Sequence, residues 1–204
     1  MRVRYKQWAV DYLKDNPSLA IESIDLSYPF FKKPISLEIG SGKGEFILTM
    51  AKKYPNHNFL AVERNRSIAG MMAKKINDEE IKNVLVCPMD IAKIFEQIPN
   101  NFFDNIYLNF SDPWPKKKHA KRRLTYIDFL NKYYDFLKDG GHIYFKSDND
   151  SLYEFTLEEI QKSKFKLVLS EFDYRFDEEH DALTGYEAKF RELGQSIHRI
   201  ILEK

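Results

Sequence analysis

From Pro34 onward, short apolar runs alternate with longer stretches in which apolar residues recur at helical spacing. The apolar runs predict seven strands, at residues 35–39, 58–62, 84–86, 104–110, 142–147, 165–170 and 197–202. The longer stretches predict helices at residues 45–54, 68–76, 91–98, 126–137 and 152–162. Strands that alternate with helices form parallel sheets covered on both faces. The order therefore predicts an α/β fold with a mostly parallel seven-stranded sheet and helices on both faces.

The first 33 residues depart from this pattern, because they are basic and aromatic and then irregular. We predict an N-terminal arm over residues 1–33, either ordered or frayed, followed by a single domain over residues 34–204. A length of 204 residues with 43% hydrophobic content is enough for one domain with its own core.

Charge and cysteine content exclude several classes of protein. The formal net charge is only +1, so a nucleic-acid-binding face would have to be local. The single Cys87 excludes a disulfide framework and a cysteine-based zinc site, and the five histidines lack ligand spacing, so we expect no metal. No apolar run approaches the roughly 18 residues of a membrane span. Since the N-terminus is also too polar for a signal peptide, we expect a cytoplasmic protein.

Candidate binding residues follow three of the predicted strands, at the carboxyl ends where parallel sheets bind their ligands. Gly40, Gly42 and Gly44 form a loop after the first strand, and glycines let a backbone turn tightly and approach a ligand closely. Glu63 ends the second strand, where an acid can accept both hydroxyls of a ribose, and Asp90 follows the third. Together they indicate a site for an adenosine-bearing cofactor.

The spacing of these glycines favours S-adenosylmethionine over other adenosine cofactors. It is G-x-G-x-G, which matches neither the G-x-G-x-x-G of dinucleotide sites nor the Walker pattern of nucleotide triphosphatases. Glu38, just before the loop, can face an ammonium group, which a methionine moiety has and a pyrophosphate lacks. Asp90 is well placed to meet the adenine amine. A tight strand–helix turn beside a solvated Glu63 is the alternative interpretation.

A second candidate site is the sequence Ser-Asp-Pro-Trp-Pro after the fourth strand. Proline fixes its own φ and restricts the residue before it, so Pro113 and Pro115 hold Asp112 and Trp114 on a stiff turn. Guanine has two neighbouring donors on its Watson–Crick edge, and one carboxylate accepts both. We predict that Asp112 addresses a guanine base. A helix cap or a purely structural turn is the alternative.

A dense run of cations follows this turn. It consists of Lys116, Lys117, Lys118, Lys121, Arg122 and Arg123, with His119 among them. A charge run is usually only a solvated helix start. However, six cations so close together repel one another and oppose a helix N-terminal dipole, and the phosphates of RNA would relieve both problems. Arg2, Arg4, Lys6 and Trp8 could add phosphate and stacking contacts, or belong to a disordered arm.

Long ordered motifs give the chain a resemblance to one enzyme family. It resembles the bacterial tRNA (guanine-N7-)-methyltransferases in the segments LEIGSGKGEF, NFSDPWPKKKHAKRRL, FKSDN and TGYEAKFRELG, and the likeness covers nearly the whole chain. The resemblance implies a Rossmann-like, class I S-adenosylmethionine-dependent methyltransferase fold. It also implies methyl transfer to N7 of a guanosine at position 46, in the variable loop of tRNA, with S-adenosylhomocysteine as the second product.

The resemblance further implies roles for individual residues. The matching cofactor positions are Glu38, Glu63, Asp90 and Asp112, and Asp112 is also the catalytic position. The matching substrate positions are Lys116, Asp148, Thr184, Gly185, Tyr186 and Glu187. The RNA-contacting segment matches Lys118 to Arg123. Two positions depart from the family pattern: Ser147 stands where threonine is common, and Gly185 interrupts a stretch often written T-E-Y-E.

The chemistry of the reaction predicts what Asp112 does. Guanine N7 has an in-plane lone pair and no proton, so it needs no general base to attack a sulfonium methyl group. The guanine becomes cationic, and a nearby carboxylate favours that change. We therefore predict that Asp112 orients the base and stabilises its charge. Asp148 and Glu187 would grip the base or ribose and Lys116 a phosphate, while Tyr186 would stack on a base or be a packed aromatic.

The expected partner is tRNA, with no DNA and no membrane, and the chain is expected to be a monomer or a homodimer. Three other functions are left open by the sequence: a methyltransferase of small molecules or proteins, a non-catalytic RNA-binding module, and a nicotinamide oxidoreductase. The first leaves the basic run without a role. The intact glycine loop with Glu63 argues against the second, and the glycine spacing disfavours the third.

Overall fold

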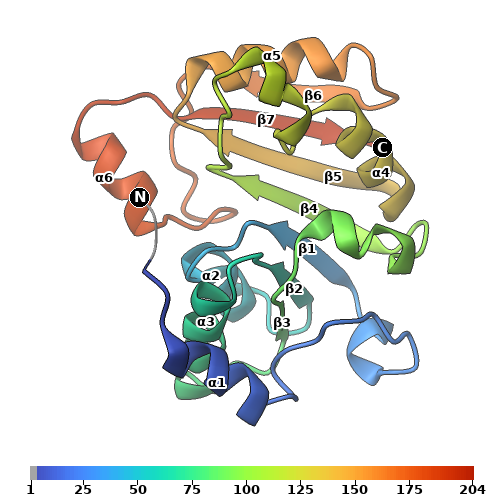
Figure 1. The fold of residues 1–204 in the computed structure, drawn as a ribbon. Coiled ribbons are helices and arrows are strands. Elements are labelled where there is room, and N and C mark those ends of the chain that lie inside the picture. Colours follow the sequence, from blue (N-terminus) through green and yellow to red (C-terminus); the bar gives the residue numbers. More distant parts are fainter. Residues whose placement is uncertain (1–3) are drawn as a thin grey trace. The chain divides into compact units, whose positions relative to one another are not determined.

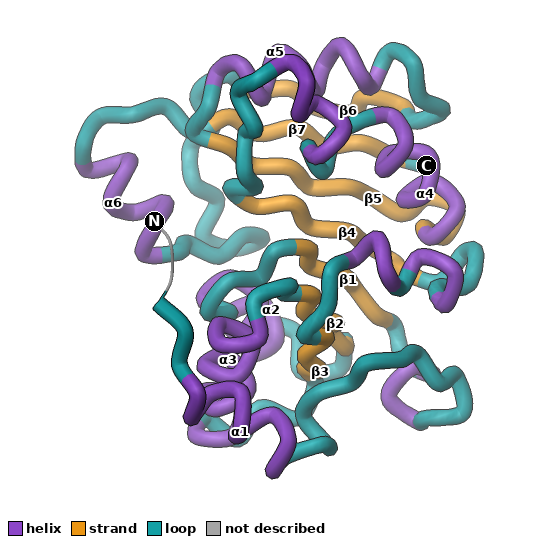
Figure 2. The backbone as a smooth tube through the Cα atoms, viewed as in Figure 1, coloured by secondary structure: helices purple, strands orange, loops and turns teal. Residues whose placement is uncertain are grey.

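A computed structural model gives the fold of residues 4–204, shown as a ribbon in Figure 1 and as a tube in Figure 2. Seven strands form one sheet in the order β3-β2-β1-β4-β5-β7-β6. Their bounds are β1 Ile35–Ile39, β2 Asn58–Val62, β3 Val84–Cys87, β4 Phe103–Asn109, β5 Leu137–Ser147, β6 Lys166–Glu171 and β7 His198–Glu203. β1 pairs in parallel with β2, β2 with β3, and β4 with β5, whereas β7 is antiparallel to β5 and β6. The predicted α/β fold with a mostly parallel sheet is confirmed.

The chain divides into two compact units, Met1–Ile98 and Pro99–Lys204. The first unit contains β1 to β3 together with α1 Gln7–Asp15, η1 Pro29–Lys32, α2 Glu45–Lys53 and α3 Arg66–Asp78. All residues of its three strands are buried, including the polar Ser36 and Glu38 of β1 and Asn58 of β2. Asn65 caps α3, because its side-chain oxygen accepts from the N–H groups of Ser67 and Ile68 at 3.0 and 3.3 Å. Arg2, one of the residues singled out in the sequence, lies outside the described part of the chain.

Helix α1 packs directly on α3, as the blue and green helices of Figure 1 show. A Cβ atom added to Gly70 of α3 would lie 1.8 Å from the backbone oxygen of Ala9, so only glycine lets the two helices approach this closely. The N–H of Lys6 also donates to the hydroxyl of Ser67 at 3.0 Å. This part of the predicted arm is therefore helical and anchored within the first unit.

The segment after α1 lies along strand β3. The N–H of Val86 donates to the backbone oxygen of Leu19 at 3.0 Å, and the N–H of Ile21 donates to the oxygen of Val86 at 2.8 Å. Ala20 thereby forms a parallel bridge with Val86. The N-terminal segment thus covers the β3 edge of the sheet.

The second unit contains β4 to β7 with η4 Lys117–Arg122, α4 Ile127–Phe136, α5 Asp150–Ile160 and α6 Gly185–Glu192. Helices α4 and α5 contact each other and β5 (Figure 1). Inside this layer the hydroxyls of Thr125 and Thr156 share a buried hydrogen bond of 2.8 Å. Tyr133 and Phe145 are among the largest fully buried side chains of the unit.

Several elements differ from those predicted. Residues 91–98 form two 3-10 helices, η2 Ile91–Lys93 and η3 Phe95–Gln97, instead of one longer helix, and the side chain of Asp90 caps the first. Strand β5 begins at Leu137, directly after α4, and not at residue 142. Helices α1 and α6 and the 3-10 helix η4 were not predicted. None of the described helices is long and apolar enough to cross a membrane.

Candidate active site

The glycine loop leaves β1 and turns into α2 through three left-handed residues. The φ angles of Gly40, Gly42 and Gly44 are 81°, 55° and 80°. A Cβ atom added to Gly40 or Gly42 would meet nothing within 4 Å, whereas one added to Gly44 would lie 2.8 Å from Cγ of Met72. Gly44 thus packs closely against the side chain of Met72 in α3, and its φ of 80° favours glycine. Gly40 and Gly42 leave open space above the backbone, as a ligand cradle requires.

Glu63 at the end of β2 shapes this loop directly. Its Oε2 atom accepts from the N–H of Gly42 at 3.1 Å, and its Oε1 atom accepts from the N–H of Asn65 at 2.8 Å. The N–H of Gly40 also donates to the backbone oxygen of Val62 at 2.8 Å. Each carboxylate oxygen has a second lone pair, so Glu63 can hold the loop and still accept ribose hydroxyls. The sequence did not show that Glu63 also holds the glycine loop in place.

Two further acids stand at the carboxyl ends of neighbouring strands. Glu38 in β1 is only 2% exposed, and β1 pairs with β2 so that Glu38 lies opposite Ala61. Asp90 follows β3 and is half-buried, with Oδ1 accepting from the N–H of Ala92 at 3.0 Å. The structure thus brings the predicted acids of the first unit to one edge of three parallel strands. Carboxylates are the natural acceptors for an ammonium group, ribose hydroxyls and an exocyclic amine, so this set fits S-adenosylmethionine.

In the second unit, the turn after β4 has an unusual backbone. Phe110 and Trp114 have φ angles of 50° and 41°, in a region that residues with side chains rarely adopt. Between them, Asp112 is exposed. The turn is anchored to β5, because the N–H of Phe110 donates to the backbone oxygen of Lys146 at 2.8 Å. A turn thus follows β4 where the sequence places it, and Asp112 is exposed on it.

The basic run that follows is not uniform. Five of its side chains are exposed: Lys116, Lys117, Lys118, Lys121 and Arg122. His119 is half-buried and meets the ring of Trp114 edge-on, with centroids 5.8 Å apart. Arg123 is only 9% exposed. The exposed cations can reach phosphates without rearrangement, whereas the guanidinium of Arg123 already donates to the backbone oxygens of Pro113 and Trp114.

Asp148 and Tyr186, both predicted to meet substrate, lie together. The phenol of Tyr186 donates to Oδ2 of Asp148 at 3.0 Å, and its ring lies 5.0 Å from that of Phe110 and 4.5 Å from that of Phe190. Partial burial, and secondarily the charge of Asp148, raise the pKa of Tyr186 to about 12. The phenol therefore stays a donor throughout the neutral range. Tyr186 is still 46% exposed, so one side of its ring is open for contact.

Glu187, also predicted to meet substrate, is fully buried instead. Its Oε2 atom accepts from Nζ of Lys146 at 2.9 Å, and its Oε1 atom accepts from Nη2 of Arg191 at 2.7 Å. Lys146 also pairs with Asp181 at 2.8 Å. Thr184 is the N-cap of α6, with its hydroxyl accepting from the N–H of Glu187 at 3.0 Å. These contacts hold α6 against β5, and a direct contact of Glu187 with substrate stays a prediction.

Sequence reasoning missed Lys146 and the structural use of the Thr-x-x-Glu motif. One signal was present: Lys146 directly follows the apolar run Ile143–Phe145 near the end of a predicted strand, and a charge in such a place needs a buried partner. A second was the spacing of Thr184 and Glu187, which matches a helix capping motif as well as a substrate motif. Gly185, exposed at the first position of α6, needs no particular backbone conformation there.

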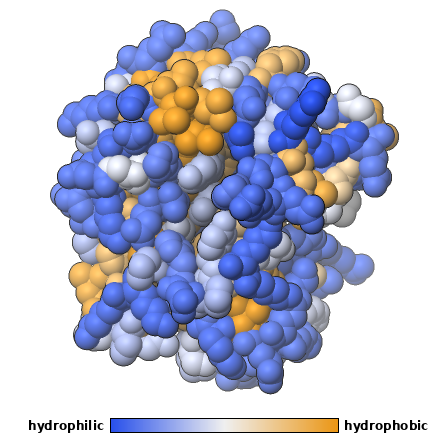
Figure 3. Space-filling view, turned by 180° about the vertical axis from the view of Figure 1, so that it is seen from behind, coloured by the Kyte–Doolittle hydropathy of each residue, from blue (hydrophilic) through white to orange (hydrophobic). Residues whose placement is uncertain are grey.

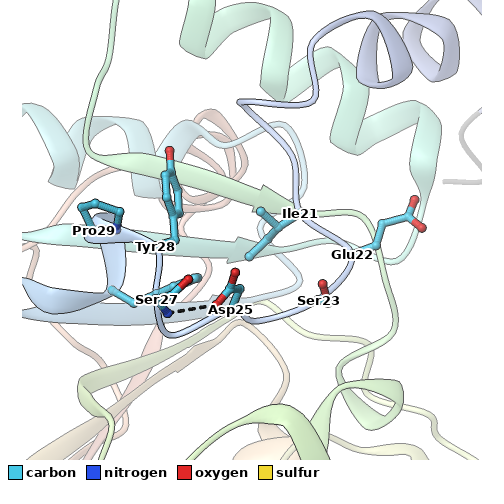
Figure 4. Close-up of a pocket in the computed structure, with 8 residues that line it drawn as sticks. Ile21, Glu22, Ser23, Asp25, Ser27, Tyr28 and Pro29 are labelled. Carbon is cyan, nitrogen blue, oxygen red and sulfur yellow. Dashed lines mark hydrogen bonds between the residues drawn. The ribbon is translucent and has the colours of Figure 1, made fainter.

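A pocket of about 420 Å³ elsewhere in the first unit does not coincide with these residues. It is formed by residues 21–31, which comprise a loop and the start of η1, with Ile21, Tyr28 and Pro29 among its lining residues (Figure 4). Glu22 points away from the other labelled side chains and pairs with Arg66 at 2.6 Å. Asp25 accepts from the N–H of Ser27 at 2.9 Å, and hydrogen bonds from Ser27 lower its pKa. Glu22 and Asp25, two acids that line the pocket, are thus engaged in contacts within the protein.

The surface seen in Figure 3 is mostly hydrophilic, with apolar side chains gathered in separate patches. Large apolar side chains exposed among the described residues include Trp8, Leu167, Val168, Phe172 and Tyr186. Trp8 and Tyr186 are two of the residues predicted to stack on RNA bases, and their exposure is what stacking requires.

Comparison with known proteins identifies the family. A family model described as "Putative methyltransferase" matches residues 32–200. The chain is 42% identical over 208 residues to a tRNA (guanine-N(7)-)-methyltransferase of Staphylococcus haemolyticus, covering 98% of this chain and 96% of the relative. The chain belongs to the tRNA (guanine-N7-)-methyltransferase family. A relative of the same name from Lactobacillus johnsonii is 40% identical over 210 residues, with 97% and 96% covered. The predicted family is confirmed. The matches are to methyltransferases, so they do not support the alternative of a nicotinamide oxidoreductase.

Solved structures support the fold class. The 16S rRNA methyltransferase KamB superposes with a TM-score of 0.67 at 11% identity, covering 89% of this chain and 94% of that one. An antibiotic-related methyltransferase superposes with a TM-score of 0.59 at 18% identity, covering 100% and 97%. These likenesses confirm the class I S-adenosylmethionine-dependent methyltransferase fold.

Proposed function

We propose that this protein transfers the methyl group of S-adenosylmethionine to N7 of a guanosine in tRNA, at position 46 of the variable loop. The observation that carries the proposal is similarity at 40–42% identity, over nearly the full length, to proteins named tRNA (guanine-N(7)-)-methyltransferase. The exposed cations beside the Asp112 turn support an RNA substrate over a small molecule or a protein.

The first unit would bind the cofactor. Glu38 would accept from the amino group of the methionine moiety, Glu63 from the ribose hydroxyls, and Asp90 from the adenine amine. Gly40 and Gly42 would let the backbone lie close to the ligand, since nothing occupies the space where their side chains would be. S-adenosylmethionine supplies an electrophilic methyl group on a positively charged sulfur.

The second unit would hold the guanosine. N7 would donate its lone pair to the methyl group that S-adenosylmethionine supplies, and the electron pair of the S–C bond would return to sulfur. No proton moves at N7, so alignment and electrostatics provide the acceleration. Asp112 would accept from the Watson–Crick edge of the base and stabilise the positive charge that the purine acquires. Asp148 and Tyr186, already joined by a hydrogen bond, would contact the base or ribose.

The basic run would hold the tRNA backbone. Lys116, Lys117, Lys118, Lys121 and Arg122 are exposed on and beside one short 3-10 helix, where their charges add. The target base must leave its stack to reach a protein pocket, and phosphate contacts on either side of it can hold the distorted strand.

The test is methylation of an unmodified tRNA transcript with labelled S-adenosylmethionine, followed by digestion and mass spectrometry of the nucleosides. We expect 7-methylguanosine from the wild-type transcript and none from a transcript with adenosine at position 46. Cofactor binding without methyl transfer to any tRNA would contradict the proposed substrate.

A second arm tests the residue assignment. Asp112→Asn should lower kcat by about 100-fold or more while leaving the Kd for tRNA nearly unchanged. Asp128→Asn is the matched control, because Asp128 is another exposed carboxylate of the same unit, in the first turn of α4. Equal turnover by Asp112→Asn and Asp128→Asn would contradict the role of Asp112.

A further inference from the structure

Arg123 ends the basic run, yet its side chain does not point into solvent with the other cations. We propose that Arg123 is a positioning residue that fixes the turn carrying Asp112, and not a contact to tRNA phosphate. The inference rests on the proposed function for its effect on catalysis, but its structural part can be tested without tRNA or cofactor.

The guanidinium of Arg123 joins two consecutive carbonyls of the turn. Its Nε atom donates to the oxygen of Pro113 at 2.9 Å, and its Nη2 atom donates to the oxygen of Trp114 at 3.1 Å. The guanidinium carbon lies 4.2 Å from the centroid of the Phe155 ring in α5. Arg123 thus connects the turn to a helix of the core, with one face stacked on an aromatic ring and two N–H groups aimed at the backbone.

The turn needs such an external anchor. Pro113 and Pro115 have no N–H, so few backbone donors are left to hold the segment, and its carbonyls are the remaining points of attachment. Trp114, between the prolines, has a φ of 41°, which persists only when surrounding contacts over-determine it. Arg123 binds the carbonyl on each side of the Trp114 Cα atom. The strained residue and the anchor therefore coincide.

The alternative, a phosphate contact, would require these bonds to be given up. Arg122, the preceding residue, is better placed to bind a phosphate. It is exposed, and its guanidinium carbon lies 4.9 Å from the Trp114 ring centroid. A phosphate can pair with Arg122 without breaking a hydrogen bond to the turn. Arg123 would have to leave Phe155 and both carbonyls, which would release the carboxylate that the reaction uses.

The kinetic test compares Arg123→Lys with Arg122→Gln. Lysine keeps the charge of Arg123 but has no planar fork to bind two carbonyls and stack on Phe155. We expect Arg123→Lys to lower kcat at saturating tRNA and S-adenosylmethionine by about 10- to 100-fold, with the tRNA Kd and its salt dependence unchanged. Arg122→Gln should instead raise the Kd and flatten the salt dependence. Unchanged kcat in Arg123→Lys, or a flattened salt dependence in Arg123→Gln, would overturn the proposal.

The structural test uses tryptophan fluorescence of the free protein. The chain has two tryptophans, so Trp8→Phe leaves Trp114 as the sole reporter of the turn. In that background, Arg123→Lys should increase acrylamide quenching of Trp114, with an unchanged far-ultraviolet circular dichroism spectrum. Phe155→Leu removes the stacking partner and should have the same effect, which keeps the test valid if Arg123→Lys folds poorly. Unchanged quenching in folded variants would overturn the inference even if tRNA methylation is confirmed. Increased quenching would support it even if the tRNA assignment fails.

Discussion

Tyr186 and Asp148 are joined by a 3.0 Å hydrogen bond from the phenol to Oδ2, although one residue lies in α6 and the other just after β5. The bond fixes the carboxylate with one oxygen engaged and the tyrosine ring against Phe110. Two residues with separate predicted roles therefore form one surface. A change in either is expected to alter how the other meets a substrate.

Tyr186→Phe tests this coupling. The variant keeps the ring contact with Phe110 but removes the donor to Asp148, so we expect the KM for tRNA to rise by about 3- to 10-fold with little change in stability. Steady-state kinetics over a range of tRNA concentrations would measure it. Tyr186→Leu, which also removes the ring, should raise KM further. A KM equal to that of wild type in Tyr186→Phe would show that the hydrogen bond has no part in substrate binding.

Lys146→Met tests the buried charge cluster under α6. Lys146 and Glu187 are almost completely buried, so removing the cation takes away the lysine that pairs with Asp181 and with Oε2 of Glu187, whereas Arg191 still pairs with Oε1 of Glu187. We expect the free energy of unfolding to fall by about 3–5 kcal/mol, measured by denaturant titration. Asp181→Asn in the same chain should restore part of this loss, because it removes the negative charge that Lys146 offsets at Asp181. A loss below about 1 kcal/mol would mean that the cluster is not a significant source of stability.

Gly70→Val tests the contact between α1 and α3. The added side chain would collide with the backbone of Ala9, so we expect a loss of about 1–3 kcal/mol and faster hydrogen exchange in residues 7–15. Ser67→Ala is the matched control on the same helix, since it removes only the hydroxyl that accepts from Lys6, for about 1 kcal/mol. Unchanged exchange in α1 of the Gly70→Val variant would contradict the close packing.

Neutralising Lys117 and Lys118 together tests the RNA-binding face. The slope of log affinity for tRNA against log salt should become shallower by roughly 0.7–0.9 for each phosphate contact that is lost. Lys52→Gln with Lys74→Gln is the control pair, because both lysines are exposed and pair with acids on the surface of the first unit. A slope that stays the same in the Lys117 and Lys118 variant would place the RNA on another surface.

Cys87 gives the chain a predictable sensitivity to alkali. Burial raises the pKa of its thiol to about 12, well above the value near 8.5 of an unfolded chain. Between these values the folded state holds the proton and the unfolded state releases it, so stability falls as pH rises above about 9. Cys87→Ala should show a smaller loss of unfolding free energy between pH 8 and 10.5. Rapid reaction of the native thiol with a disulfide reagent at pH 8 would contradict its burial.

Strands were the part of the fold that the sequence predicted best. β1 and β2 are buried along their whole length, so their apolar runs end where the strands end, at Gly40 and Glu63. Helix α6 was missed because GYEAKFRE begins with glycine and has no continuous apolar stripe; a buried ion cluster stabilises it. Residues 91–98 have apolar residues at helical spacing but form two 3-10 helices. The spacing of apolar residues does not distinguish an α-helix from short 3-10 helices.

Side chains of the candidate site were harder to predict, because identical residue types have different surroundings. Arg122 and Arg123 are adjacent and chemically equal, yet one is exposed and the other is held by Pro113 and Trp114. What separates them is Phe155, which lies 32 residues further along the chain and is brought beneath Arg123 by the packing of the unit. Motif spacing locates such a site but does not show which of its charges are free.

The bridge between Ala20 and Val86 makes the N-terminal segment a cover for an open β-edge. A chain shortened to begin after residue 21 would uncover the backbone N–H of Val86 and the carbonyl that Ile21 now engages. Bare strand edges recruit other strands, so such a truncation would favour self-association and loss of soluble protein. Any deletion meant to probe the amino-terminal basic residues should therefore stop before Leu19, or it will measure aggregation in place of RNA affinity.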